Sequence, residues 1–419
     1  MKRRKCRAET RTKSIVAVVV CAAVLMMTLV VLVPRAGAST PSRGSFLLEG
    51  PPFLALTPNL TLTSPHPQTD GYFGSSAAIS STTVVVGAYG EKASGYAQAG
   101  HVYLFGAMSG KLVHRLTSPN AQSGGNFGFA VAISGTTVVV GAPNEAASNY
   151  SGAGHAYVFN ASTGKLIRTL TSPHAQYGGC FGYSVAITGS TLVIGAMCET
   201  ADTACCGNYS AGHVYAFDAT SGKLTLTLTS PNAQPDGAFG SSVAVSGTRL
   251  MVGAPGEGPS PPVQYPPGAA YLFEAKTGAL IANLTDPQPA GSGRFGSSVA
   301  IDSTTAVVGA GGETASGVQY AGLTYLYNAT TGNLTRTLAP PKPTYTGGFG
   351  QSVAISGTKV FVGNGSYIYV FKATTGKRVL TLTMGGVVSV MGTTVMIGAA
   401  GETVSGSKDA GQAYIFKGV

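Results

Sequence analysis

The chain has 419 residues with 59 Gly, no Trp and only 10% charged residues, a composition that predicts short strands joined by many turns. Its formal net charge is +10. Eight basic residues and Glu9 within residues 1–35 account for +7 of this, which leaves +3 for the remainder. A nearly neutral remainder argues against a basic groove, so no nucleic-acid partner is expected.

Residues 1–38 have the features of a targeting segment. A basic cluster precedes the mainly apolar run Ile15–Val33, and the small-residue site Ala36–Ala38 follows it. These features are typical of a cleaved signal peptide, but the apolar run is nearly long enough to span a membrane. A signal peptide and an uncleaved membrane anchor therefore both stay open, and both predict a secreted or cell-surface protein. Residues 39–58, rich in Pro, Ser and Gly, are predicted to be a linker.

Potential N-glycosylation sites support export. Eight of the twelve Asn residues stand in N-x-S/T sequons, which is more than chance predicts, although several fall in repeated turn words such as "NAST" and "NATT". Glycosylated Asn residues lie on the surface of exported proteins. The candidates are Asn59, Asn149, Asn160, Asn208, Asn283, Asn328, Asn333 and Asn364.

Residues 59–419 contain an internal repeat. A Phe-Gly pair recurs at spacings of 54–58 residues, and a degenerate seventh copy begins at Met384. Periods of this size indicate a propeller or a solenoid. Each copy holds four strand-like pieces, in the second copy "AVAIS", "TVVVGA", "GHAYVF" and "LIRTLTS". The third piece places two aromatic residues on one face, here Tyr157 and Phe159, and such pairs are suited to packing between neighbouring sheets.

The two ends of the repeat region complement each other. The seventh copy stops after its third strand, whereas an unmatched fourth strand, "NLTLTSP" at residues 59–65, precedes the first copy. We therefore predict an all-β fold, a seven-bladed β-propeller of four-stranded antiparallel blades. The N-terminal strand completes the last blade and closes the ring.

Short sequence motifs beside the strands resemble those of a known family. "FG…GAP", as in Phe127-Gly128 followed by Gly141-Ala142-Pro143, resembles the FG-GAP repeats of integrin-α-type propellers over residues 59–419. This resemblance implies the propeller fold, which adhesins, receptors and some enzymes share. The hairpins also resemble those of quinoprotein propellers, but the Trp residues that dock the quinone have no counterpart in this chain.

The resemblance would also imply calcium sites between the first two strands of a blade. Here that connection is a short "SGT"-type turn, and Asp302 is its one acid in seven copies. Calcium needs six to eight oxygen ligands. We therefore predict no metal and no cofactor.

Acidic residues recur with the repeat. In six copies, a Glu stands four residues after the Gly of the Gly-Ala pair that ends the second strand-like piece. The "SPNAQ"-type loops before the next copy should lie on the same face of the ring as these Glu residues. The candidate binding rim comprises Glu91, Glu145, Glu199, Glu257, Glu313 and Glu402, with His66, Asn120, His174 and Asn232.

Two interpretations of these acids stay open. They form a polar rim for a glycan, peptide or cation, or each Glu braces its own loop through backbone N–H groups. Equal acids in separate blades provide no unlike acid–base pair, so we expect no enzyme. His101, His155 and His213 each stand at the start of the third strand of a copy, and they are expected to be exposed to solvent.

Four cysteines are confined to the third copy: Cys180, Cys198, Cys205 and Cys206. In an exported protein they predict two disulfides, for which three connectivities exist. A bond between adjacent cysteines is sterically awkward, so Cys180 and Cys198 are each expected to pair with Cys205 or Cys206. A four-cysteine metal site is the alternative.

These features predict a binding or adhesion module that contacts a protein or glycan ligand at the cell surface through loops on one face. Two alternatives belong to other classes: an extracytoplasmic glycan-active enzyme with its site at the channel mouth, and a structural envelope protein.

Overall fold

The computed structural model describes residues 56–200, 210–258, 266–289 and 292–419. The chain divides into Met1–Gly50 and Pro51–Val419, and all described residues belong to the second unit. The predicted targeting segment, most of the linker, Asn208, Cys205 and Cys206 lie outside these ranges. Within them, no helix is long and apolar enough to cross a membrane.

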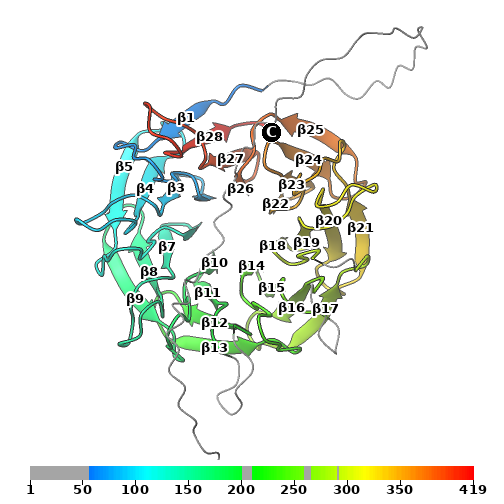
Figure 1. Ribbon diagram of the computed structural model, residues 1–419, viewed down its shortest axis with the longest axis horizontal. Helices are drawn as coiled ribbons and strands as arrows, with labels where there is room; N and C mark the ends of the chain where they lie inside the picture. Colours follow the sequence, from blue (N-terminus) through cyan, green and yellow to red (C-terminus); the bar gives the residue numbers. More distant parts are fainter. Residues whose placement is uncertain (1–55, 201–209, 259–265, 290–291) are drawn as a thin grey trace, which may run out of the picture. The chain divides into compact units, whose positions relative to one another are not determined.

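The described strands form seven four-stranded antiparallel sheets, arranged as the blades of a propeller (Figure 1). Blades one to three consist of β2 (Ser76–Ile79), β3 (Thr83–Ala88), β4 (His101–Gly106), β5 (Leu112–Thr117); β6 (Ala130–Ser134), β7 (Thr137–Ala142), β8 (His155–Asn160), β9 (Leu166–Thr171); and β10 (Ser184–Thr188), β11 (Thr191–Ala196), β12 (His213–Asp218), β13 (Leu224–Thr229). Blades four to six consist of β14 (Ser242–Ser246), β15 (Arg249–Ala254), β16 (Ala269–Glu274), β17 (Leu280–Thr285); β18 (Ser298–Ile301), β19 (Thr305–Ala310), β20 (Leu323–Asn328), β21 (Leu334–Leu338); and β22 (Ser352–Ser356), β23 (Lys359–Gly363), β24 (Ile368–Lys372), β25 (Arg378–Leu382). Blade seven consists of β26 (Val387–Met391), β27 (Thr394–Ala399), β28 (Gln412–Phe416) and β1 (Leu60–Thr63).

The ring is closed as the sequence predicts. The innermost strand of each blade contacts the innermost strand of the next, including β26 and β2. β1 pairs with β28, with Leu60 opposite Ile415, and so supplies the outer strand of blade seven. The N-terminal strand therefore covers the edge that β28 would otherwise expose.

Aromatic residues and glycines determine how the blades pack. Phe127 is fully buried, and its ring centroid lies 5.6 Å from that of Tyr157 and 5.9 Å from that of Phe159. Tyr157 and Phe159 also belong to one buried cluster with Leu104 of blade one, which confirms the predicted packing of the aromatic pairs between blades. Gly141 approaches the next blade so closely that a Cβ atom would lie 1.9 Å from the carbonyl oxygen of Gly182. Only glycine permits this approach of two backbones.

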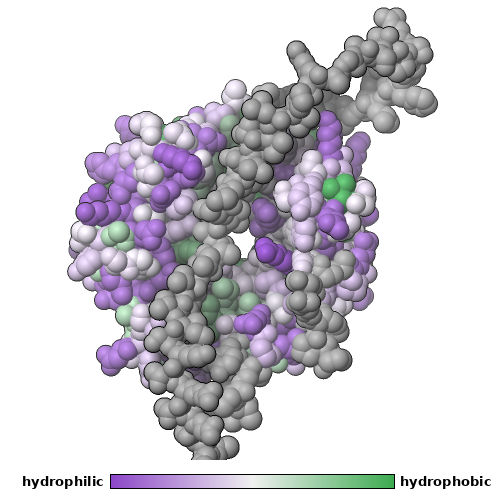
Figure 2. All heavy atoms as spheres, viewed as in Figure 1, coloured by the Kyte–Doolittle hydropathy of each residue, from purple (hydrophilic) through white to green (hydrophobic). Residues whose placement is uncertain are grey.

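The two ends of the blades form two different faces. We call one of them the hairpin face. It carries, in each blade, the connection between the first and second strands and the connection between the third and fourth strands, and it includes the adjoining strand ends. The opposite face, the loop face, carries the two longer connections of each blade. The backbones of these connections form hydrogen bonds between neighbouring blades. For example, the N–H of Phe127 donates to the carbonyl of Ala99. Figure 2 shows the ring's central opening, with hydrophobic as well as hydrophilic residues near it.

Candidate functional site

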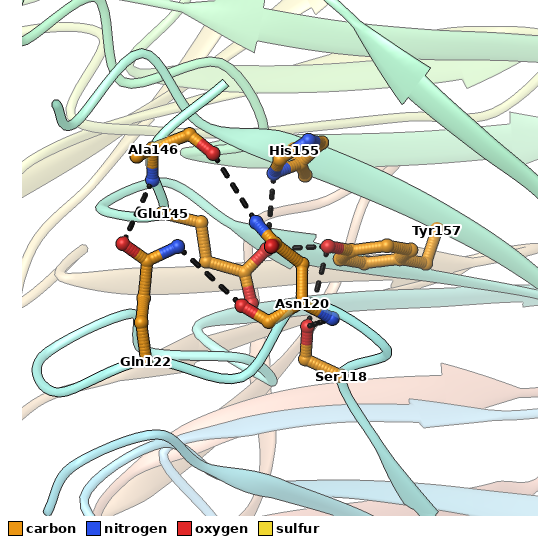
Figure 3. Close-up of polar contacts among 7 residues, drawn as sticks. All are labelled: Ser118, Asn120, Gln122, Glu145, Ala146, His155 and Tyr157. Carbon is orange, nitrogen blue, oxygen red and sulfur yellow. Dashed lines mark hydrogen bonds and ion pairs between the residues drawn. The ribbon is translucent and has the colours of Figure 1, made fainter. Parts of the chain in front are cut away.

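In blade two, the repeated Glu lies inside the protein. Glu145 follows β7 in the loop to β8, and it is 0% exposed. The hydroxyl of Tyr157 on β8 donates a hydrogen bond to Glu145 Oε2, and His155 Nδ1 lies 3.0 Å from the same oxygen. Ser118 Oγ donates to the Tyr157 hydroxyl at 3.2 Å. Figure 3 shows how these side chains converge. The other carboxylate oxygen, Oε1, is buried without a hydrogen bond.

Four other blades repeat this cluster. A tyrosine hydroxyl donates to the buried Glu in each, and blades one and three also bring a histidine Nδ1 to within 2.8 and 3.1 Å of the carboxylate. The pairs are Tyr103 with Glu91, Tyr215 with Glu199, Tyr271 with Glu257 and Tyr325 with Glu313.

These contacts correct two expectations. The five Glu residues are interior residues and not a solvent-facing rim, because their carboxylates lie beneath the loops. All five accept from a tyrosine and three also approach a histidine, whereas the described backbone N–H groups of their own loops are not their partners. His101, His155 and His213 are likewise buried and were wrongly expected to be solvated.

Burial changes the protonation of the clusters. It raises the pKa of Glu257 to about 7 and that of Glu313 to about 8, because both carboxyl groups are removed from water. Burial and the adjacent carboxylate raise the pKa of the Tyr157 and Tyr271 hydroxyls above their ordinary value. The hydroxyls therefore remain protonated and act as donors.

Blade five has the most unusual cluster. Asp286 occupies the position that Ser118 holds in blade two, and besides burial its charge raises the pKa of the Glu313 carboxyl. Burial also raises the pKa of Asp286. Asp286 and Glu313 are only 7% and 1% exposed. This pair of carboxyl groups therefore lies below the surface of the loop face.

The amides of the "SPNAQ" loops hold neighbouring loops together. Gln122 Oε1 accepts from the N–H of Ala146, 3.1 Å away, and Asn120 Nδ2 donates to the Ala146 carbonyl at 3.2 Å. In blade four, Asn232 and Gln234 hold Gly258 in the same way. Asn120 and Asn232 are thus positioning residues for the loop that follows the buried Glu, and Figure 3 shows this clamp for blade two.

The remaining candidates of the predicted rim are exposed. Glu402 of blade seven and His66 lie at the surface of the loop face. His174 is also exposed, and its Nδ1 lies 3.0 Å from the Tyr215 hydroxyl while its ring stacks on His213. The structure therefore does not gather the predicted rim residues into one site.

The cysteines pair differently from the expectation. Cys180 and Cys198 form a disulfide with Cα atoms 5.5 Å apart, which joins the two loops of blade three. The expectation that each would pair with Cys205 or Cys206 was wrong. The two cysteines are neighbours in space because the loops that carry them pack together on the loop face.

Several sequons also have a local structural use. The side-chain oxygens of Asn160, Asn328 and Asn364 accept from backbone N–H groups two and three residues further on, as Asx turns do. Asp218 Oδ1 accepts from Ser221 in the equivalent hairpin. Turn formation therefore accounts for part of the sequon excess. Asn59, Asn149, Asn283 and Asn333 are exposed, and glycosylation stays a prediction.

The sequence interpretation missed a set of tyrosines on the loop face. Every large aromatic residue that is exposed in the described residues is a Tyr in a loop of this face, and Tyr177 is the most exposed at 77%. The set is Tyr96, Tyr150, Tyr177, Tyr320, Tyr345 and Tyr367. A signal was present, since these tyrosines lie in polar loops outside the strand pattern.

The central channel offers little chemistry. Its volume is about 310 Å³, and it is lined by the middle residues of the seven inner strands. All of these are Ala, Val or Ile except Ser389. Within the described ranges, no group of three His, Cys, Asp or Glu side chains could hold a metal ion.

Comparison with protein families agrees with this architecture. A family model described as FG-GAP repeat matches residues 60–105, 111–159, 167–217, 224–273 and 279–327. Each matched segment comprises the outer strand of the preceding blade and the first three strands of one of blades one to five. The comparison with curated proteins gives no significant match.

Proposed function

Because the chain belongs to the FG-GAP repeat family, whose propeller is a module commonly used for binding, we propose that it is an exported binding or adhesion module. The proposed ligand is a protein or a glycan at the cell surface, contacted by the loop face. The observation that carries this proposal is the set of six exposed tyrosines on that face. Tyrosine is enriched in recognition surfaces because a rigid ring provides contact area and its hydroxyl provides a hydrogen bond.

The loops that carry the tyrosines are rigidly supported. Tyr150 lies in the loop that Gln122 clamps at Ala146, and the N–H of Tyr150 donates to the Ala147 carbonyl. Tyr320 and Tyr345 come from adjacent loops, and their ring centroids lie 5.8 Å apart. Preorganised loops lose less conformational entropy on binding, which favours affinity.

The enzymatic alternative has weaker support. The acids best suited to general acid–base chemistry, Asp286 and Glu313, lie below the surface in this conformation. The channel that would hold the substrate is lined by aliphatic side chains and Ser389. General acid–base catalysis needs a titratable group within hydrogen-bond reach of the substrate.

Glycan and peptide arrays test the proposal. The wild-type protein is expected to bind a defined class of ligand, and Tyr96→Ser, Tyr150→Ser and Tyr320→Ser combined should abolish this binding. The matched control replaces three exposed leucines of the hairpin face, Leu112, Leu166 and Leu224, by Ser and should retain it. Retained binding in the tyrosine variant, or turnover of an array glycan, would overturn the proposal.

A further inference from the structure

The hairpin face is strongly basic, although the propeller as a whole is nearly neutral. Five of the hairpins between third and fourth strands carry a lysine: Lys111, Lys165, Lys223, Lys276 and Lys377. Seven more Lys or Arg lie at this face, among them Arg249, Lys359 and Lys417. Against these twelve stand three acids, Asp218, Glu274 and Asp302, so the described residues give this face a net charge of +9.

Two arginines in the middle of outer strands belong to this charge, whereas Arg115 on β5 is counted with neither face. Arg168 on β9 donates to the carbonyl of Thr220 in the next blade's hairpin, and Arg336 on β21 donates to that of Thr374. Both guanidinium groups are thus held at the hairpins.

The loop face has no such charge. Among described residues outside the interior, it carries four basic side chains and four acids, a net charge of zero. The other six acids of the loop-face connections are buried.

Exposed aliphatic side chains gather on the same basic face. Every exposed Leu, Ile, Val or Met among the large hydrophobic residues of the described ranges lies in a hairpin of this face or at the adjoining strand ends. Met108 is 75% exposed, and Leu112, Leu166 and Leu224 each directly follow a hairpin lysine. Alternating lysines and exposed leucines are suited to a lipid surface, where lysines meet anionic head groups and leucines enter the acyl boundary.

The first described strand begins at this face. β1 runs from the hairpin face towards the loop face, and Asn59 Oδ1 just before it accepts from the N–H of Lys417. The chain therefore enters the ring at the hairpin face.

We propose that the hairpin face is a docking surface for an anionic lipid bilayer. The hairpin lysines attract the head groups, the leucines and Met108 insert beside them, and the flat ring of seven blades lies on the membrane. This surface is separate from the loop face, so it does not depend on the ligand proposed there.

Vesicle sedimentation tests this docking with residues 51–419. All seven hydrophobic core clusters and the closing pair of β1 with β28 lie within this fragment, so it keeps every described contact. Circular dichroism at the outset verifies that each preparation is folded. The fragment should bind phosphatidylcholine vesicles that contain phosphatidylserine, bind much less to phosphatidylcholine alone, and dissociate as salt is raised.

Two sets of variants separate the alternatives. Lys111→Gln, Lys165→Gln and Lys223→Gln combined should lower vesicle binding about 100-fold, since each lysine near an anionic membrane contributes about fivefold. The matched control neutralises three cations of the loop face, Lys92, Arg294 and Lys408, and should bind like the wild type. Equal losses in the two triple variants would overturn the proposal.

The leucines distinguish a membrane from a soluble polyanion. Leu112→Ser, Leu166→Ser and Leu224→Ser combined should weaken vesicle binding and leave retention on heparin unchanged. If the wild-type fragment binds heparin or nucleic acid but no anionic vesicles, or if the leucine variant binds vesicles like the wild type, the face is not a lipid-docking surface.

Discussion

Replacing Glu313 by Gln should stabilise the propeller increasingly as the pH rises from 5 to 7. Glu313 is 1% exposed, and burial raises its pKa to about 8 from an ordinary value of 4.5. The folded state therefore retains a proton that the unfolded state releases above pH 4.5. The stabilisation from this group is fully present below pH 4.5 and is lost as the pH rises towards 8.

The size of the effect follows from the two pKa values. One retained proton changes the free energy of unfolding by about 1.4 kcal/mol per pH unit, which gives about 2.5 kcal/mol between pH 5 and pH 7. For a domain of this size, 1 kcal/mol corresponds to about 1.3 °C in Tm. Gln does not titrate, and its side-chain carbonyl can still accept from Tyr325. The difference in Tm between Glu313→Gln and the wild type should therefore grow by about 3 °C over this range.

Thermal unfolding followed by circular dichroism at several pH values measures this difference. Glu402→Gln is the matched control, because Glu402 holds the same repeat position but is exposed. Its Tm difference from the wild type should not change with pH. A constant Tm difference for Glu313→Gln between pH 5 and pH 7 would show that its carboxyl group is not desolvated in the folded protein, and the reasoning would be refuted.

Three further perturbations test the loop clusters and the blade packing. Tyr157→Phe removes the donor to a buried carboxylate and should lower the free energy of unfolding by about 1–3 kcal/mol in urea titrations, whereas the exposed Tyr150→Phe should have no effect. Reduction of the Cys180–Cys198 disulfide, whose partners are 18 residues apart, should cost about 3 kcal/mol and lower the Tm by about 4 °C; a Cys180→Ser variant should not respond to reductant. Gly141→Ala should lower the free energy of unfolding by at least about 1–3 kcal/mol in urea, since its Cβ atom would overlap the next blade's backbone; equal stability would contradict the close packing.

The fold could be predicted because its determinants are periodic in the sequence. Phe127, Tyr157 and Phe159 recur with the repeat, and they pack in one buried cluster with residues of blade one. The unmatched strand at residues 59–65 identified the closing pair of β1 and β28. Local alternation and a single repeat length were sufficient for these conclusions.

The burial of the Glu residues could not be read in the same way, because it depends on which loop covers them. Glu145 stands in a polar loop, and it is buried because a second loop covers it. Gly125 of this covering loop packs so closely that a Cβ atom on it would lie 2.9 Å from Glu145 Cγ. The covering loop before β6 comprises residues 118–129, whereas residues 383–386 alone precede β26. Glu402 therefore stays exposed although it has the same place in the repeat.

The same burial explains why total charge was a poor guide to the surface. The net charge of +3 outside residues 1–35 counts acids that lie in the interior, so it conceals a hairpin face of +9 and a neutral loop face. The buried Glu of a repeat follows the second strand, at the loop face, and the lysine lies in the hairpin after the third strand, at the hairpin face. Because the repeats are arranged in a ring, the two faces differ in charge. A ring lying on a bilayer by its lysines and leucines would direct the tyrosines of the loop face away from the membrane. The docking surface and the ligand surface are thereby compatible, while the separate substitutions allow either to fail without the other.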